Sequence, residues 1–199
     1  MIKMIYAEIL SYHFNEKFNV YEFTLKYGIK PLPGQFISII FPNEKEVPLS
    51  VGDYKDGILT LYIESEKLAK ELREKRKVIV KGPLGKALPL NVKSILGIAK
   101  NNHNYLDINY VLKEGERRGI KTYLNCEECG INSGVEDAEM IVASVPESEI
   151  NRLPRKALVY VRWVKMNCGL GVCGVCAYKG FLPCIEGPFI EVDKIVDKR

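Results

Sequence analysis

Four cysteines in the last third of the chain have the spacing of iron–sulfur ligands. Cys168, Cys173 and Cys176 form a Cys-x4-Cys-x2-Cys run, and Cys184 follows it. Thiolates at this spacing hold [2Fe–2S] clusters, which are electron carriers. The sequence therefore predicts an electron-carrying [2Fe–2S] cluster bound by these four thiolates.

Three glycines between these cysteines, Gly169, Gly171 and Gly174, favour a cluster over a zinc site. A loop around an anionic cluster must turn backbone N–H groups toward the sulfurs and adopt positive φ, which glycine tolerates at little cost. Zinc sites more often use two Cys-x2-4-Cys pairs, or cysteine with histidine. The only histidines are His13 and His103. Structural zinc and disulfides remain the alternatives.

Composition describes a globular chain that is long enough for two or three small domains. Of its 199 residues, 47% are hydrophobic and 27% charged, and its net charge of +4 is too small and scattered to indicate a nucleic-acid partner. There is no apolar run long enough to cross a membrane and no signal-peptide core at the N-terminus. We therefore expect no membrane association and a cytoplasmic location, where cysteines bind metals more often than they crosslink.

Residues 1–92 have the pattern of an antiparallel β-barrel, with short β-prone runs separated by proline, glycine and asparagine. The segment Ser65–Leu72 has helical spacing. A glycine-rich turn is expected at Gly82–Gly85. The expected strands are Ile5–Tyr12, Asn19–Lys26, Gln35–Phe41, Ile58–Ile63 and Lys77–Lys81.

Residues 93–163 alternate between strand and helix patterns, which predicts a short, Rossmann-like α/β domain with a mostly parallel sheet. Residues 164–199 form the cysteine module, with one more strand at Pro188–Val192. The fold class is thus mixed: barrel, α/β domain and C-terminal [2Fe–2S] module. Expected strands are Ser94–Ala99, Ile120–Asn125, Glu139–Ala143 and Ala157–Trp163, with helices at Asn104–Arg118 and Pro146–Arg152.

The order of motifs resembles the electron-transfer subunit of dihydroorotate dehydrogenase, within the ferredoxin-reductase-like superfamily. Those motifs are Pro33-Gly34-Gln35-Phe36, Pro48-Leu49-Ser50, Gly82-Pro83-Leu84-Gly85 and the C-terminal cysteine run. The resemblance covers nearly the whole chain. Its most specific part is Met166–Cys176 together with Cys184-Ile185-Glu186-Gly187-Pro188.

The resemblance implies cofactors and a partner. In that family the barrel and the α/β domain bind FAD and NAD(H), and the cluster carries electrons between FAD and the FMN of a separate catalytic subunit. The chain would then be a non-catalytic subunit of a heterotetramer that serves pyrimidine biosynthesis. The flavin-binding candidates are Leu49, Ser50, Gly82, Pro83, Leu84 and Gly85.

Two alternatives are kept open. The partner could instead be a sulfite reductase or a hydrogenase that uses a similar electron-transfer subunit. An alternative from a different class is a zinc-stabilised interaction module with no redox role.

The flavin site departs from the family pattern at two places. Relatives carry an arginine for the FAD diphosphate where this chain has Val47, and a glycine-rich turn where it has Glu64-Ser65-Glu66-Lys67. Loss of a cation and gain of carboxylates both act against diphosphate binding. FAD binding therefore stays open on the sequence alone.

The nucleotide site departs further. A glycine-rich turn that opens a helix brings dinucleotide phosphates close to the backbone, yet Lys100–Asn104 contains no glycine. Ala143-Ser144-Val145-Pro146 also replaces the Cys-Gly-Pro of relatives. We expect loss of NAD(P) binding and an electron acceptor other than NAD.

A second cysteine pair, Cys126-Glu127-Glu128-Cys129, is followed by Gly130 and further loop residues. A thioredoxin-like motif would sit at a helix N-terminus. The sequence therefore predicts either a loop with two thiols or a disulfide, without a role as cluster ligands.

Overall fold

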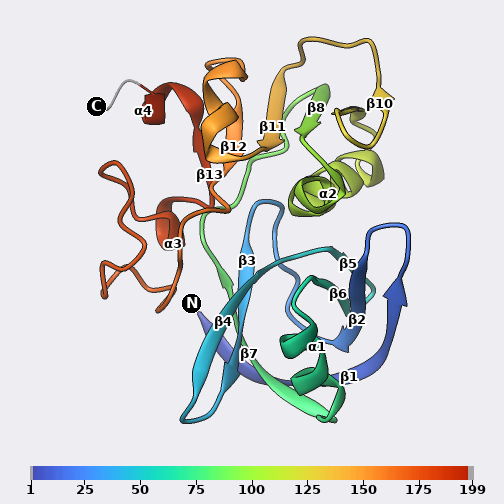
Figure 1. The fold of residues 1–199 in the computed structure, drawn as a ribbon, viewed down its shortest axis with the longest axis vertical. Coiled ribbons are helices and arrows are strands. Elements are labelled where there is room, and N and C mark those ends of the chain that lie inside the picture. The colour runs from blue at the N-terminus through green and yellow to red at the C-terminus, as the bar shows by residue number, and fades with distance from the viewer. Residues whose placement is uncertain (1, 197–199) are drawn as a thin grey trace.

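A computed structural model describes residues 2–196, which contain two β-sheets, one in the lower and one in the upper half of the molecule as drawn in Figure 1. The lower sheet contains the N-terminal strands, drawn in blue to green, and the upper sheet contains the later strands, drawn in green to red. The structure is therefore a mixed α/β fold with a separate antiparallel sheet.

The first sheet has seven antiparallel strands in the order β4-β3-β7-β1-β2-β6-β5. Alternate residues of β6, namely Leu59, Leu61 and Ile63, are fully buried, as expected for a strand with one face on the core. The strands are β1 Lys3–Asn15, β2 Val20–Lys26, β3 Phe36–Phe41, β4 Lys45–Ser50, β5 Asp53–Lys55, β6 Ile58–Ile63 and β7 Lys77–Leu84.

Helix α1 (Glu66–Arg73) covers this core through Leu68 and Leu72. It begins at Ser65, whose Oγ accepts the Leu68 N–H at 3.2 Å. The predicted helix at Ser65–Leu72 is confirmed to within one residue.

The second sheet has six strands in the order β10-β9-β8-β11-β12-β13. Strands β9, β8, β11 and β12 are parallel, and β10 and β13 are antiparallel edge strands. The central strands are buried apolar runs, as in sheets covered on both faces. The strands are β8 Ser94–Ala99, β9 Lys121–Cys126, β10 Ile131–Asn132, β11 Met140–Ser144, β12 Leu158–Tyr160 and β13 Phe189–Glu191.

Helix α2 (Asn102–Arg117) joins the two sheets. It lies so close to β8 that a Cβ on Gly97 would be 2.8 Å from Leu112. On its other side, Asn109 donates to the Gly52 carbonyl at 3.0 Å, and the Tyr110 hydroxyl donates to the Pro31 carbonyl at 2.6 Å. The helix therefore fixes the first sheet relative to the second.

The remaining helices are short: a 3-10 helix at Glu147–Arg152, α3 at Pro183–Glu186 and α4 at Val192–Val196. Within residues 2–196, none of the helices combines the length and apolar character needed to cross a lipid bilayer.

Three features of the first sheet differ from the sequence prediction. Strand β5 was not predicted, because it has only three residues. Strand β4 was not predicted, because Lys45, Glu46 and Pro48 break the apolar alternation and no residue of this strand is fully buried. Gly82–Gly85 was expected to form a turn, but β7 continues to Leu84 and pairs with Phe36 of β3.

The predicted strand near the C-terminus is present, but it belongs to the second sheet. β13 pairs with β12, with Val159 opposite Ile190, and Val192 and Ile195 are buried beyond it. Residues 164–188 thus form an excursion between two neighbouring strands rather than the start of a separate module that runs to residue 199. Residues 197–199 of that predicted module lie outside the described part of the chain.

Candidate cofactor sites

The cysteine segment, residues 164–188, packs against the first sheet. In Figure 1 it lies with α3 beside the junction of the two sheets. A small core holds it there, and β3 and β7 contribute to this core. Its buried members are Phe36, Leu84, Met166, Cys176 and Cys184.

The loop adopts positive φ at its glycines, as the sequence predicted. Gly169 has φ +64° and Gly171 has φ +73°. A Cβ on Gly169 would be 2.8 Å from Leu84, and one on Gly171 would be 2.7 Å from Ile185. Glycine is therefore required at both positions by conformation and by space.

Backbone amides point at the first thiol of the run. The Leu170 N–H donates to Cys168 Sγ at 3.4 Å. This bond, with further ones from the Cys173 and Val172 amides, lowers the pKa of Cys168 to about 6. The loop therefore stabilises negative charge on sulfur, as an anionic cluster requires.

The four thiols form two pairs. Cys168 lies within hydrogen-bonding contact of Cys173, and Cys184 lies within the same contact of Cys176. Burial, followed by this contact with Cys176, raises the pKa of Cys184 to about 12, although the Gly171 N–H opposes the shift. The two pairs also interact electrostatically, through Cys168 and Cys184.

The donor set could serve two irons, with one thiol pair on each. Within residues 2–196, no three histidine, cysteine or acidic side chains are grouped closely enough to hold a metal ion as they stand. A [2Fe–2S] cluster takes two thiolates on each iron, so that its four ligands are spread over two centres. Two separate thiol pairs meet that requirement.

A cavity of about 460 Å³ lies between the first sheet and the second. Its walls come from β4, β6, the start of α2 and the end of β12. Of the flavin-binding candidates, it brings together Leu49 and Ser50. The apolar and aromatic side chains in its lining include Phe36, Leu49, Tyr62, Leu106, Tyr160 and Met166.

Gly82–Gly85 do not line this cavity. Leu84 packs with the buried cysteines, and the Lys86 N–H just beyond donates to the Gly187 carbonyl at 2.6 Å. A Cβ on Gly85 would be 2.5 Å from that same carbonyl. These residues support the cysteine segment, so the structure divides the six flavin candidates between two places.

A buried carboxyl group forms the polar part of the cavity. Asp107 of α2 accepts a hydrogen bond from Ser144 at 2.8 Å and is paired with Arg162 Nε at 3.3 Å. Burial outweighs both and raises the pKa of Asp107 to about 7. Ser50 also bonds this carboxyl group, so the flavin candidate is part of a network that the sequence did not indicate.

Arg162 is the cation that the sequence prediction missed. It enters the cavity from the end of β12 and pairs with Glu64 as well as Asp107. His103 Nδ1 lies 3.4 Å from the same Glu64. A lone arginine between Val161 and Trp163 gives no local signal, because only the fold brings it to Glu64.

The cavity is large enough for a ring system, and two cations, Arg162 and Lys165, line it together with the carboxylates of Glu46, Glu64 and Asp107. Its volume is in the range of small-ligand sites, and apolar and aromatic side chains dominate its walls. Val47 supplies no charge here, and Arg162, just beyond β12, is paired with Glu64 and Asp107.

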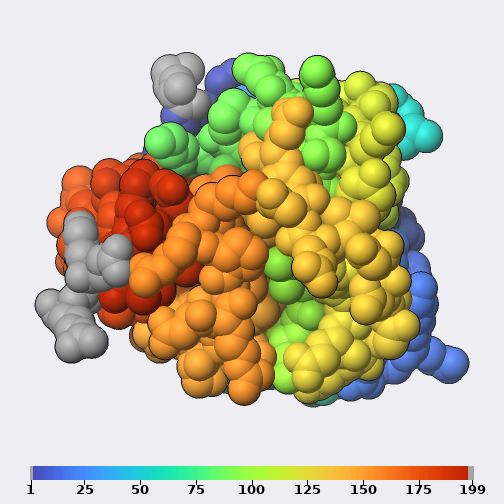
Figure 2. Space-filling model, turned by 90° about the horizontal axis from the view of Figure 1, so that it is seen from above, coloured from blue at the N-terminus to red at the C-terminus, as the bar shows by residue number. Residues whose placement is uncertain are grey.

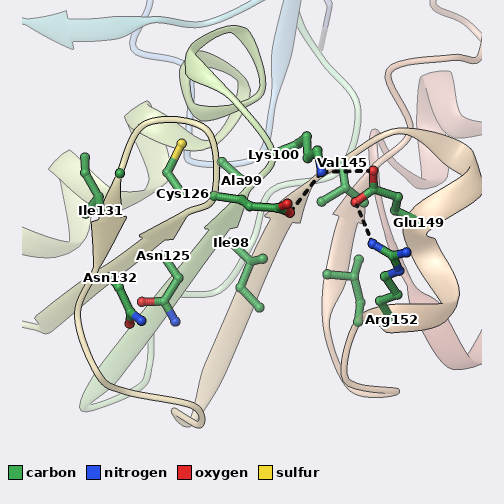
Figure 3. A pocket seen from close by; sticks show the side chains of 13 residues that line it. Ile98, Ala99, Lys100, Asn125, Cys126, Ile131, Asn132, Val145, Glu149 and Arg152 are labelled. Atoms are coloured by element: carbon green, nitrogen blue, oxygen red, sulfur yellow. Dashed lines mark hydrogen bonds and ion pairs between the residues drawn. The ribbon is translucent and has the colours of Figure 1, made fainter.

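A second cavity, of about 530 Å³, lies at the carboxyl ends of β8, β9 and β11, where parallel α/β sheets bind ligands. Figure 2 shows it from above as a hollow in which green atoms are visible between orange and yellow segments. Lys100 occupies the position of a phosphate-binding turn. Its Nζ lies 2.9 Å from Glu127 and 3.3 Å from Glu149, which in turn pairs with Arg152 (Figure 3).

The second cysteine pair forms a disulfide at the wall of this cavity. Cys126 is buried at the end of β9 and is bonded to Cys129. The intervening turn is fixed by the Glu128 N–H, which donates to the Lys100 carbonyl at 2.8 Å. Of the two alternatives from the sequence, the structure has the disulfide.

No protein-family model and no curated protein sequence matches this chain, but solved structures do. A chain of the NADH-dependent reduced ferredoxin–NADP oxidoreductase, studied for flavin-based electron bifurcation, has a TM-score of 0.65 at 20% identity, covering 95% of this chain and 88% of that chain. Phthalate dioxygenase reductase, a modular structure for electron transfer from pyridine nucleotides to [2Fe–2S], has a TM-score of 0.60 at 10% identity, covering 87% and 85%.

The ferredoxin reductase of carbazole 1,9a-dioxygenase is also similar, with a TM-score of 0.57 at 14% identity over 79% of this chain and 69% of that chain. Two of these three proteins are described by their use of NADH or pyridine nucleotides, so they lend no support to the expected loss of NAD(P) binding. At these identities the likeness concerns architecture. The chain has the fold of the ferredoxin-reductase-like electron-transfer proteins.

Proposed function

We propose that this chain is the electron-transfer subunit of an oxidoreductase, with a [2Fe–2S] cluster on Cys168, Cys173, Cys176 and Cys184. The observation that carries the proposal is the arrangement of the thiols: two pairs, in a glycine loop with amides directed at sulfur. When bound, the cluster takes up and releases one electron at a time. The zinc alternative accounts less well for the Cys-x4-Cys-x2-Cys spacing and the three glycines within it.

The chain's own residues would hold and shield this group. The amides of Leu170, Val172 and Cys173 stabilise charge on Cys168. Phe36 and Leu84 cover the barrel side of the loop and exclude water there. This burial leaves the exposed Cys173 as the ligand most open to solvent or a partner.

A flavin in the cavity between the sheets would lie next to the cysteine segment. Phe36 and Met166 line this cavity and also belong to the small core around Cys176 and Cys184. One layer of side chains thus separates the two sites, which favours electron transfer between them. We therefore place FAD in this cavity, with its ring against Leu49 and Ser50 and a phosphate at Arg162.

The partner that fits this role is an FMN-containing catalytic subunit of the dihydroorotate dehydrogenase type, in a heterotetramer. The sequence resemblance supports that choice over a sulfite reductase or hydrogenase. Exposed apolar side chains near the cysteines suit a docking surface, which we call the loop patch: Leu170, Val172, Val175 and Ile185.

The electron acceptor in this proposal is not NAD. Lys100 and its glutamate partners occupy the position where a glycine turn would admit phosphates. NADH at millimolar concentration or below should then leave the visible bands of the loaded chain unchanged in stopped-flow experiments. Rapid bleaching by NADH would show that the nucleotide site is functional.

Anaerobic purification of the full chain, followed by iron, sulfide, zinc and flavin analysis, tests the proposal directly. We expect a red-brown protein that dithionite bleaches, with about two irons and two sulfides per chain. A colourless, zinc-containing chain would instead support the interaction module. Co-purification with a catalytic partner, followed by reduction with dihydroorotate, then separates dihydroorotate dehydrogenase from the other partners.

A further inference from the structure

Lys81 of β7 is a buried cation beneath the cysteine segment. Only 6% of its surface is exposed. Its Nζ lies 3.1 and 3.2 Å from the two carboxylate oxygens of Glu46 and 2.5 Å from the carbonyl oxygen of Cys168. All three donors of the ammonium group therefore have an acceptor, and one of them belongs to a proposed cluster ligand.

The burial of Lys81 is energetically costly and therefore calls for a structural or functional explanation. Burying an ammonium group costs several kcal/mol unless it is paired and hydrogen-bonded. An apolar residue would fill this buried position of β7 without that cost, as Val80 does at the neighbouring position. Lys81 instead links the loop to the sheet through a charge-assisted hydrogen bond.

Both charges of this ion pair lie close to the proposed cluster site. Lys81 Nζ bonds the Cys168 carbonyl, so the positive charge is one hydrogen bond from the backbone of a proposed ligand. Glu46 of β4 pairs with Nζ and also lines the cavity between the sheets.

We propose that Lys81 is a positioning residue for the cluster: it anchors Cys168 through its backbone carbonyl and raises the reduction potential of the cluster. The inference rests on the proposed function, because it takes the four thiolates as cluster ligands. It adds a residue outside the cysteine loop to that site. It also makes Glu46 the opposing charge, at the boundary between the cluster and the flavin cavity.

The sign of the effect follows from electrostatics. Reduction adds one negative charge to the cluster, and a nearby cation stabilises that charge, more so in a buried site than in water. Removing the Lys81 charge should therefore lower the potential. Removing the Glu46 charge should raise it, because the carboxylate opposes the added electron.

The experiment compares four variants of the full chain by potentiometric titration of the visible and electron-paramagnetic-resonance signals. Lys81→Met removes the charge and keeps the stem, and Lys81→Arg restores the charge. Glu46→Gln removes the opposing charge. Lys30→Met is the control, because it removes one positive charge that is half exposed and paired with Glu114, on α2.

We expect Lys81→Met to shift the one-electron equilibrium about tenfold toward the oxidised cluster, which corresponds to about 59 mV. Glu46→Gln should shift it in the opposite direction, and Lys81→Arg and Lys30→Met should stay near the wild-type value. If the potentials of Lys81→Met and Glu46→Gln shifted in the same direction, general loosening of the fold would explain the shifts and the electrostatic part of the proposal would be wrong. Equal potentials in wild type, Lys81→Met and Glu46→Gln would overturn the proposal.

Hydrogen exchange tests the anchoring part separately and does not depend on which metal is bound. In Lys81→Met the amides of residues 169–173 should exchange about tenfold faster than in Lys81→Arg, and unchanged exchange would refute the anchor.

If Lys81→Met fails to retain iron, the potentials of Lys81→Arg and Glu46→Gln decide the electrostatic part. A wild-type chain that holds zinc would contradict the proposed function and the potential effect, while the exchange comparison would still test the anchor.

Discussion

The two cysteine groups of this chain have the same residue type in opposite surroundings. Cys168, Cys173, Cys176 and Cys184 are free thiols in a loop with several inward amides and positive-φ glycines. Cys126 and Cys129 close a short turn as a disulfide, beside a lysine held by two glutamates. The difference shows that the backbone and the charges around two cysteines, as well as their spacing, decide whether they stay free thiols or form a disulfide.

The comparison extends to the cavities beside the two groups. The cavity next to the cysteine loop has many aromatic and apolar side chains in its walls, and its charged groups include Asp107 and Glu64, both paired with Arg162. The cavity next to the disulfide has ion pairs at the carboxyl ends of its strands. In the proposed function the first region holds the cofactors, and Lys100 with its glutamates occupies the position where the phosphates of a nucleotide would lie in the second.

The largest effect should come from removing a thiol of the first group. Serine at Cys168, Cys173, Cys176 or Cys184 should cost the chain most of its iron, because a hydroxyl is a poor cluster ligand and the segment has only a small core to hold it together. Iron per chain and the visible spectrum measure this. The matched variant Cys126→Ser should keep its iron, and equal losses in the Cys126 and Cys173 variants would disprove the ligand assignment.

The positive-φ glycines of the cysteine loop could be predicted because they depend on local spacing inside one short segment, whereas the ligand set itself stays a prediction. Strands such as Ile58–Ile63 were predictable for a similar reason, since alternation with period two reports a buried face. Both features are set by residues close together in the sequence, which is why the sequence alone indicates them.

The rest depends on contacts between distant segments. Lys81 and Arg162 look like ordinary surface charges in the sequence, and only the positions of β7 and β12 bring them to Cys168 and Asp107. β13 was predicted as a strand but assigned to the wrong unit, because its partner β12 lies about thirty residues earlier in the chain. Pairing register and charge partners are therefore the parts that the sequence alone did not reveal.

The next largest effect should come from the loop glycines. Gly169→Ala forces an L-residue into positive φ and places a Cβ 2.8 Å from Leu84, so we expect a loss of about 2–4 kcal/mol and partial loss of iron. Gly130→Ala, in the disulfide loop, has the same φ penalty with nothing within 4 Å of the new Cβ. It should cost about 1 kcal/mol and no iron. Thermal unfolding measures the loss of stability and chelator competition the loss of iron. Equal iron losses in Gly169→Ala and Gly130→Ala would show that the cysteine loop does not hold the cluster as proposed.

The disulfide should matter for stability alone. The double change Cys126→Ser and Cys129→Ser releases a short turn and should lower the free energy of unfolding by about 2 kcal/mol, because the unfolded chain regains entropy. Iron content, cluster potential and reduction by the partner should not change. Denaturant titration gives the first quantity, and a shifted potential would mean that this pair communicates with the cluster.

The smallest effect concerns docking. In the loop patch, Val172 is 79% exposed and Leu170 44% exposed, so aspartate at either position leaves the small core intact. A charge that must be desolvated in an apolar contact should weaken association with the catalytic subunit about tenfold, or about 1.4 kcal/mol. Ile131, 46% exposed in β10 beside the disulfide, provides the matched control Ile131→Asp. Because iron should stay bound in all three variants, co-elution on gel filtration reports docking alone: if Leu170→Asp and Val172→Asp associate as tightly as Ile131→Asp, the loop patch is not the docking surface.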